Sequence, residues 1–302
     1  MSTSTARSEP YAAKHAVIVF WARDDSDARR EALSMSLSLN HMGIISQTKL
    51  TLAGDTPAWD VADAIRSLEM KFRLTSEPKL IIFFYAGHAT VDDNGRLRLC
   101  ESTTSTRGFN FDAVADELTR PVGDYHGFAQ TDVVLFLDCC YPARVMRRPP
   151  TTGRTVEVFA AAAATKWATL EDREELQKDS REPANCLTNM FTMAVQDSYN
   201  RGREAIDSGW LLRVFSRYSG TSSPYHDRLL GTTPIRVPTG YTYAGRTTRP
   251  APIAPSPPTP SSRAQTLFSD GGRFCDCCLA ELDQAHRQLE TLPETTSLRL
   301  RR

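Results

Sequence analysis

Two apolar runs decide the fold expected for this chain: KLIIFFYAGHA at residues 79–89 and DVVLFLDCCY at residues 132–141. Both are continuously apolar, as strands are when helices cover both faces of a parallel sheet. The first run leads to His88, and the second leads to Cys139 and Cys140. A thiol and an imidazole are the groups that a cysteine nucleophile requires, because the imidazole can accept the thiol proton and return it to a leaving group.

The rest of the first 240 residues alternates between strand and helix patterns. Predicted strands lie at 15–22, 44–53, 79–88, 96–101, 132–140 and 156–165. Predicted helices lie at 29–41, 55–72, 112–118, 185–199 and 210–219. Residues 223–238 are expected to form a loop and a last short strand. This alternation indicates an α/β protein whose mostly parallel sheet carries helices on both faces.

The carboxyl ends of parallel strands gather ligand-binding and reactive groups at one edge of a sheet. His88 and Cys140 each follow a strand at that edge, so we expect them to meet. Successive side chains of a strand point in opposite directions, so one of the two adjacent cysteines faces the core. We interpret Cys139 as a packed thiol and Cys140 as the reactive one. A hydrogen-bonded loop histidine at His88 is the alternative interpretation of this residue.

Bulk composition favours an ordinary intracellular domain with appendages. The 302 residues carry 36 basic and 36 acidic side chains, so net charge favours neither nucleic acid nor a membrane, and we expect neither as a partner. No apolar run is long enough for a membrane span, and the N-terminus has no apolar signal segment. Seven cysteines without such a signal indicate reduced thiols. We expect a cytoplasmic protein, with the nucleus as the alternative.

Four segments are expected along the chain. Residues 1–13 form a flexible N-terminus, and residues 14–240 form the α/β domain. Residues 241–273 form a linker that contains the proline-rich run PAPIAPSPPTPSSR. Residues 274–302 form a tail with the apolar spacing of a short amphipathic helix, where we expect a protein partner to dock.

The two reactive motifs resemble those of the caspase-like clan, and of metacaspases in particular. In that family a Tyr-Ser-Gly-His-Gly pattern ends the histidine strand, and this chain has YAGHA at residues 85–89. An Asp-x-Cys-His-Ser-Gly pattern ends the cysteine strand, and this chain has DCCYPA at residues 138–143. His88 precedes Cys140 by 52 positions, close to the caspase separation of about 50. The resemblance covers roughly residues 13 to 238 and implies a caspase-like three-layer α/β/α sandwich.

The resemblance implies a cysteine endopeptidase that acts on a protein or peptide substrate. Cys140 matches the nucleophile and His88 the general acid/base. The backbone N–H groups of Ala89 and Cys140 match the donors that stabilise the oxyanion.

Specificity is also implied by the resemblance. Asp138 matches an acidic residue that binds a substrate Lys or Arg in metacaspases. Asp24 or Asp25 is the counterpart of a second acid that follows the first strand in that family. The alternative for Asp138 is a cap or turn residue at the end of its strand.

Departures from the family pattern cluster beside the two reactive residues. Ala89 replaces a glycine, and its Cβ would cost about 1–2 kcal/mol if the backbone required a left-handed conformation. Tyr141-Pro142-Ala143 replaces His-Ser-Gly. These changes keep open a second function, a catalytically impaired caspase-like protein that serves as an interaction module. A nucleotide-binding sheet is a weaker third reading, because no glycine-rich phosphate loop follows a strand.

We assign no cofactor and no metal. The cysteines at 275, 277 and 278 lack the second ligand pair of a zinc site. The resemblance implies possible activation by calcium, which binds clustered acids in many metacaspases. Asp92, Asp93 and Asp172 are acidic here, but they do not match the calcium site of that family. Family members are often cut in the loop after the cysteine strand, where Arg147, Arg148 and Arg154 are the candidate positions.

Overall fold

The computed structural model describes residues 10–24, 26, 28–72, 77–102, 104–119, 131–139, 154–160, 187–218 and 225–239. The chain divides into two compact units, Met1–Thr248 and Arg249–Arg302, and every described residue belongs to the first. The predicted linker at 241–273 and tail at 274–302 therefore lie outside the described residues. None of the described helices is long and apolar enough to span a membrane.

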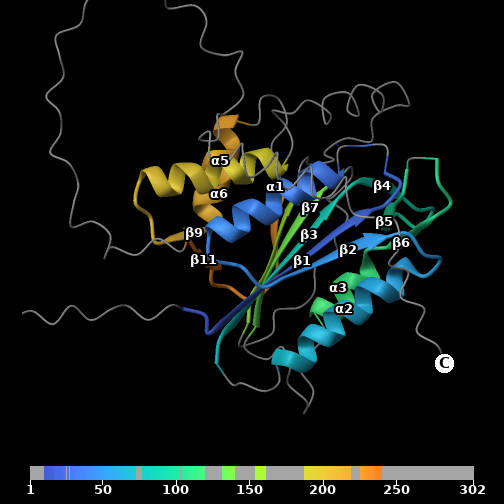
Figure 1. Cartoon of the computed structure of the whole chain (residues 1–302), viewed down its shortest axis with the longest axis horizontal. Helices are drawn as coiled ribbons and strands as arrows, with labels where there is room; N and C mark the ends of the chain where they lie inside the picture. Colours follow the sequence, from blue (N-terminus) through green and yellow to red (C-terminus); the bar gives the residue numbers. More distant parts are fainter. Residues whose placement is uncertain are drawn as a thin grey trace, which may run out of the picture. The chain divides into compact units, whose positions relative to one another are not determined.

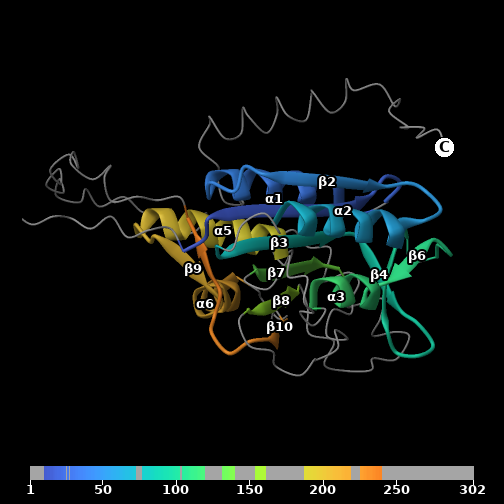
Figure 2. The same ribbon diagram turned by 90° about the horizontal axis from the view of Figure 1, so that it is seen from below.

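A six-stranded sheet forms the centre of the first unit, with its strands in the order β10-β8-β7-β3-β1-β2 (Figure 2). The bounds are β1 (Ala13–Trp21), β2 (Gln47–Leu52), β3 (Lys79–Ala86), β7 (Thr131–Asp138), β8 (Val156–Ala160) and β10 (Tyr225–Leu230). Every neighbouring pair from β8 to β2 is parallel, and β10 runs antiparallel to β8. The predicted α/β fold with a mostly parallel sheet is confirmed.

Helices cover both faces of this sheet (Figure 1). One face carries α2 (Pro57–Phe72) and α3 (Asp112–Thr119), and the other carries α1 (Ala28–His41), α5 (Leu187–Asn200) and α6 (Ser208–Tyr218). The eight residues of β3 are all buried. Ile81, Phe83 and Tyr85 belong to the core under α2, whereas Leu80, Ile82 and Phe84 belong to the core under α1 and α5. Burial of each such side chain contributes roughly 1.5–3 kcal/mol, so β3 anchors both layers.

Two smaller sheets lie at opposite ends of the central one (Figure 2). At one end, β4 (His88–Val91), β5 (Leu97–Cys100) and β6 (Gly108–Asn110) form an antiparallel sheet. At the other end, β9 (Ala205–Asp207) pairs with β11 (Arg236–Pro238). The prediction of one strand through His88 is wrong in detail, because β3 ends at Ala86 and His88 begins a separate strand, β4.

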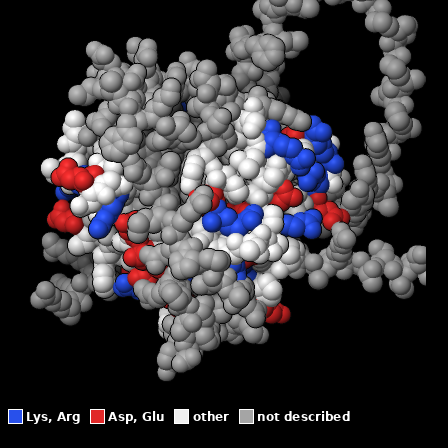
Figure 3. Space-filling view, turned by 180° about the vertical axis from the view of Figure 1, so that it is seen from behind, with Lys and Arg blue, Asp and Glu red and all other residues white. Residues whose placement is uncertain are grey.

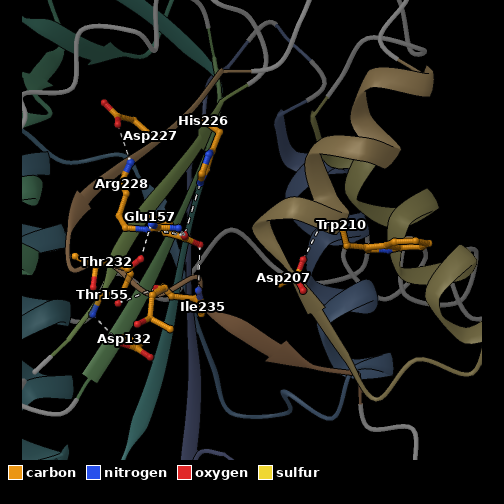
Figure 4. A network of polar contacts seen from close by, with 11 residues as sticks. Asp132, Thr155, Glu157, Asp207, Trp210, His226, Asp227, Arg228, Thr232 and Ile235 are labelled. Carbon is orange, nitrogen blue, oxygen red and sulfur yellow. Dashed lines mark hydrogen bonds and ion pairs between the residues drawn. The ribbon is translucent and has the colours of Figure 1, made fainter.

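The prediction of a loop at the start of residues 223–238 is also wrong, because β10 forms there and closes the sheet. Its side chains are mostly polar, which is why the sequence does not resemble a core strand. A buried carboxylate on the neighbouring strand explains the pairing (Figure 4). Glu157 is 1% exposed, and its Oε1 accepts bonds from Nε and Nη2 of Arg228 at 3.0 and 2.8 Å. The ion pair thus fixes the edge strand to β8.

Further contacts extend this network on both sides of the carboxylate. The second oxygen of Glu157 accepts the backbone N–H of Ile235 at 3.4 Å. The ring of His226 lies 4.6 Å from that of Phe159, and its Nε2 is 3.7 Å from Glu157 Oε1. One buried acid therefore holds both β10 and the segment that leads into β11.

Candidate active site

His88 lies at the carboxyl edge of the central sheet, immediately after β3. Ala86 is the register partner of Asp138, the last residue of β7, and the Gly87 N–H donates to the Asp138 carbonyl at 3.2 Å. The end of β3 is therefore fixed beside the end of β7, as the sequence predicts. His88 itself is 6% exposed. His88 is therefore a buried imidazole at the sheet edge where β7 ends.

Asp24 is the carboxylate next to the imidazole. It follows the end of β1, and its Oδ1 lies 3.8 Å from His88 Nε2, with both side chains buried. The same oxygen accepts the backbone N–H of Ser26 at 2.7 Å and is bonded to the Ser26 hydroxyl. Oδ2 is buried and has no hydrogen-bond partner among the described residues. A buried carboxylate oxygen without a donor is costly, which is typical of functional sites.

Gly87 allows this carboxylate to approach the backbone. Its φ is 139°, a conformation that side chains rarely adopt. A Cβ built on Gly87 would lie 2.6 Å from Asp24 Oδ2 and 3.0 Å from the Tyr85 hydroxyl. No residue with a side chain fits here unless the carboxylate moves, so glycine sets the position of Asp24 over the start of β4.

Tyr85 fixes the backbone at His88 through a hydrogen bond from its hydroxyl. Its hydroxyl donates to the His88 carbonyl at 2.8 Å and accepts the indole N–H of Trp21 at 3.1 Å. Complete burial raises the pKa of Tyr85 well above its usual value, so this hydroxyl stays protonated and remains a donor. Neither Trp21 nor Tyr85 was predicted to belong to the site. The signal was an aromatic residue with a polar atom at the end of each of two neighbouring core strands.

Asp138 contacts the first turn of α5. Its Oδ1 accepts the Leu187 N–H at 3.2 Å, and its Oδ2 accepts the Thr188 N–H at 2.8 Å and the Thr188 hydroxyl at 2.6 Å. A carboxylate in this position satisfies N–H groups that have no partner within the helix and interacts favourably with the helix dipole. These contacts agree with the alternative in which Asp138 caps an element. Its role in substrate binding stays a prediction.

The other predicted site residues are placed as follows. Ala89 is buried in β4 opposite Leu99. Its backbone is therefore that of a strand, and its Cβ does not meet the penalty of a left-handed conformation. Cys139 is buried and belongs to the core under α2, as expected for a packed thiol. Cys140 and Asp25 lie outside the described residues; Cys140 comes two positions after the end of β7 in the chain.

The remaining predictions concern metals and processing. In the part of the chain that the structure describes, no group of three or more His, Cys, Asp or Glu side chains is arranged to hold a metal. Asp92 instead accepts the N–H groups of Asn94 and Arg96 at 3.0 and 2.8 Å in a turn. Arg154 is 5% exposed, and its Nη2 donates to the Leu118 carbonyl at 2.8 Å. Burial argues against Arg154 as a cleavage position.

Several residues of the metal and processing predictions have no described position. They are Asp172, Arg147, Arg148 and the cysteines of the tail, all outside the described residues.

Comparison with known proteins finds similarity at the level of structure. No protein-family model matches the sequence, and no curated protein matches it. A Geobacter sulfurreducens protein solved by structural genomics is 12% identical, with 73% of this chain and 94% of that chain covered at a TM-score of 0.47. Caspase-1 from Spodoptera frugiperda is 12% identical, with 80% and 99% covered at a TM-score of 0.45. The likeness is one of fold.

Proposed function

We propose that the chain is a caspase-like cysteine endopeptidase in which Cys140 is the nucleophile and His88 the general acid/base. The observation that carries the proposal is the position of His88. Its imidazole is buried beside a carboxylate at the edge of the sheet where β7 ends, and the chain reaches a cysteine pair directly after β7. A histidine that served only as a core residue would not need this acidic neighbour.

The chemistry follows from these groups. His88 takes the proton of the Cys140 thiol, and the thiolate sulfur attacks the carbonyl carbon of the scissile peptide bond. The tetrahedral oxyanion is stabilised by backbone N–H groups, for which Ala89 and Cys140 are the candidates. The C–N bond then breaks as His88 returns the proton to the leaving amine. Water, deprotonated by His88, hydrolyses the remaining thioester and releases the acid product and the thiol.

Asp24 is the acid that we propose for substrate recognition. Its Oδ1 faces His88, and its Oδ2 has no donor in the described part of the chain. A Lys or Arg side chain of a substrate would supply that donor in a charge-assisted bond. Asp138 is less suited to this role, because both of its oxygens accept bonds at the start of α5. We therefore propose cleavage after basic residues, with Asp24 as the main determinant.

A thiol-reactive probe tests the proposed nucleophile. We expect a peptidyl acyloxymethyl ketone with arginine at its reactive end to label wild-type protein on Cys140, as located by mass spectrometry. His88→Ala should slow labelling by about 10²–10⁴, the range for loss of a general acid/base. Cys139→Ser is the matched control and should still be labelled, because Cys139 belongs to the core.

Circular dichroism must show that each variant is folded. Labelling that persists in Cys140→Ala, or that is unaffected in folded His88→Ala, would sink the proposed mechanism.

Asp24→Asn tests the proposed specificity. We measure kcat/KM on paired substrates that carry arginine or its neutral analogue citrulline at the cleavage position. Loss of the charge-assisted contact should lower the preference for arginine about tenfold or more. If Asp24 only orients His88, both substrates will lose the same factor and the preference will be unchanged. Asp138→Asn is the control variant, and it should affect stability more than preference.

A second function, an inactive caspase-like interaction module, is favoured by one observation. Asp138, the implied specificity acid, is occupied at the start of α5. Folded protein that binds peptides but is not labelled at Cys140 would support this alternative over the peptidase.

A further inference from the structure

Three arginine side chains surround the ring of Trp210, far from the candidate active site. The guanidinium carbons of Arg201, Arg203 and Arg213 lie 5.4, 4.2 and 5.6 Å from the ring centroid. Trp210 is in the first turn of α6, next to β9, at the end of the sheet opposite to β4 (Figure 2). Figure 3 shows Lys and Arg side chains gathered on the surface at this end of the molecule. A single cation is enough for a cation–π contact, so three around one ring require another explanation.

Two buried N–H groups in this cluster have no acceptor in the described part of the chain. Nε1 of Trp210 and Nε of Arg203 are both buried without a hydrogen-bond partner among the described residues. Trp210 is 6% exposed. Buried tryptophan N–H groups usually find a partner, and an unsatisfied donor beside a charged group is rarer still. Two such donors in one cluster point to a ligand that supplies acceptor oxygens.

The charges of the cluster are also unbalanced. Arg201 is paired with Asp197 at 2.9 Å, whereas Arg203 and Arg213 form no ion pair within the described residues. A planar ring has two faces, so at least two of the three guanidinium groups share one face. Nearby like charges repel, and an anion between them would remove that repulsion.

Asp207 does not supply the missing charge. Its Oδ1 accepts the backbone N–H of Trp210 at 2.8 Å and caps α6 (Figure 4). Figure 4 also shows Asp207 and Trp210 to one side of the Glu157 network, in which Glu157 is paired with Arg228. Asp207 and Asp197, the two acids with contacts to this cluster, are thus committed to the helix cap and to Arg201.

We propose that Arg203, Arg213 and the Trp210 indole N–H form a binding site for a phosphate group, either free or esterified to a serine or threonine. Two uncompensated guanidinium groups match a phosphate monoester, which carries about −1.5 to −2 charges at neutral pH. The guanidinium fork presents N–H groups at the spacing of phosphate oxygens. The indole N–H and the Arg203 Nε–H add two donors that have no acceptor in the described part of the chain. The proposal does not depend on peptidase activity.

Inorganic phosphate is the probe for this site in the full chain. The protein is labelled with ¹⁵N-tryptophan, and its four indole signals are followed as sodium phosphate replaces sodium chloride at constant ionic strength. We expect a saturable shift of the Trp210 signal, which is assigned with Trp210→Phe. Arg203→Gln should raise the Kd for phosphate about tenfold or more, the equivalent of one lost charge-assisted bond. Arg213→Gln, at an exposed position, should also weaken binding and does not threaten the fold.

Arg66→Gln is the matched control. Arg66 also stacks on a tryptophan, Trp59, at 5.2 Å, and it is paired with Glu117. This variant removes the same charge from the protein and should leave the phosphate Kd unchanged. Absence of a saturable shift, or equal weakening by Arg66→Gln and Arg203→Gln, would overturn the proposal.

Competition identifies the source of the phosphate. A phosphoserine peptide that displaces phosphate, when its unphosphorylated copy does not, assigns the site to a modified protein. Binding of free phosphate without displacement by the peptide assigns it to a small phosphorylated ligand. Both results support the site and separate its ligands.

Discussion

Gly87→Ala is expected to lower the labelling rate of the candidate active site at least tenfold and to destabilise the protein by about 2–4 kcal/mol. The added Cβ would lie 2.6 Å from Asp24 Oδ2, on a backbone whose φ of 139° already disfavours a side chain. The carboxylate must move away from His88, or the start of β4 must shift. The free energy of unfolding in urea and the rate of reaction with the arginyl probe measure the two effects.

Gly54→Ala is the control for this substitution. A Cβ at Gly54 would meet its nearest atom, Asp60 Oδ2, at the ordinary contact distance of 3.7 Å. This variant should lose less than about 1 kcal/mol and keep the labelling rate of the wild type. If Gly87→Ala behaves in the same way, the carboxylate is not fixed over this glycine and its place in the site is wrong.

Glu157→Ala is expected to destabilise the fold by about 3 kcal/mol, since removal of one partner leaves a charge in a largely buried site. Arg228 would keep its guanidinium beside β8 with no carboxylate, and the Ile235 N–H would lose its acceptor. The edge strand β10 and the segment that leads into β11 should be the first to open. Urea unfolding gives the magnitude, and hydrogen exchange at the β10 amides gives the location.

Glu117→Ala is the matched control, because Glu117 forms an ion pair at 2.9 Å with Arg66, whose side chain is 43% exposed to solvent. Pairs of that kind contribute about 0–1 kcal/mol, so the loss should be small. The double variant Glu157→Met with Arg228→Met should recover much of the lost stability, since an apolar pair of similar volume often replaces a buried ion pair without cost. Equal losses in Glu157→Ala and Glu117→Ala would contradict a special role for the buried acid.

The sheet and helices were predictable because apolar patterns report burial. The runs through β1, β3 and β7 are apolar at nearly every position, and both cores use them in alternation. A polar strand such as β10 lacks the apolar pattern from which the other strands were predicted. β10 pairs through Arg228 and Glu157, a contact between residues 71 positions apart that no local pattern indicates.

The candidate site was predictable in its position but less so in its contacts. The register of β3 against β7 places the ends of these two strands side by side, as predicted. The sequence offered Asp24 or Asp25 as the second acid, and the structure places Asp24 against His88. The sequence could not show that Asp138 turns to α5, because its partner Thr188 follows 50 positions later. The conformation of Gly87 depends in the same way on Asp24, which is distant in the chain.

The hydroxyl of Tyr85 links two residues that lie far from each other in the sequence, Trp21 and His88. It bonds the indole of Trp21 in β1 and the backbone of His88 in β4. Loss of the hydroxyl alone leaves the buried Trp21 N–H without its acceptor, whereas replacement of both aromatic polar atoms by apolar groups removes that donor as well. Loss of the hydroxyl at residue 85 is therefore less costly when residue 21 has also lost its indole N–H. Covariation of these two positions would mark the support of the histidine even in relatives whose reactive residues have been lost.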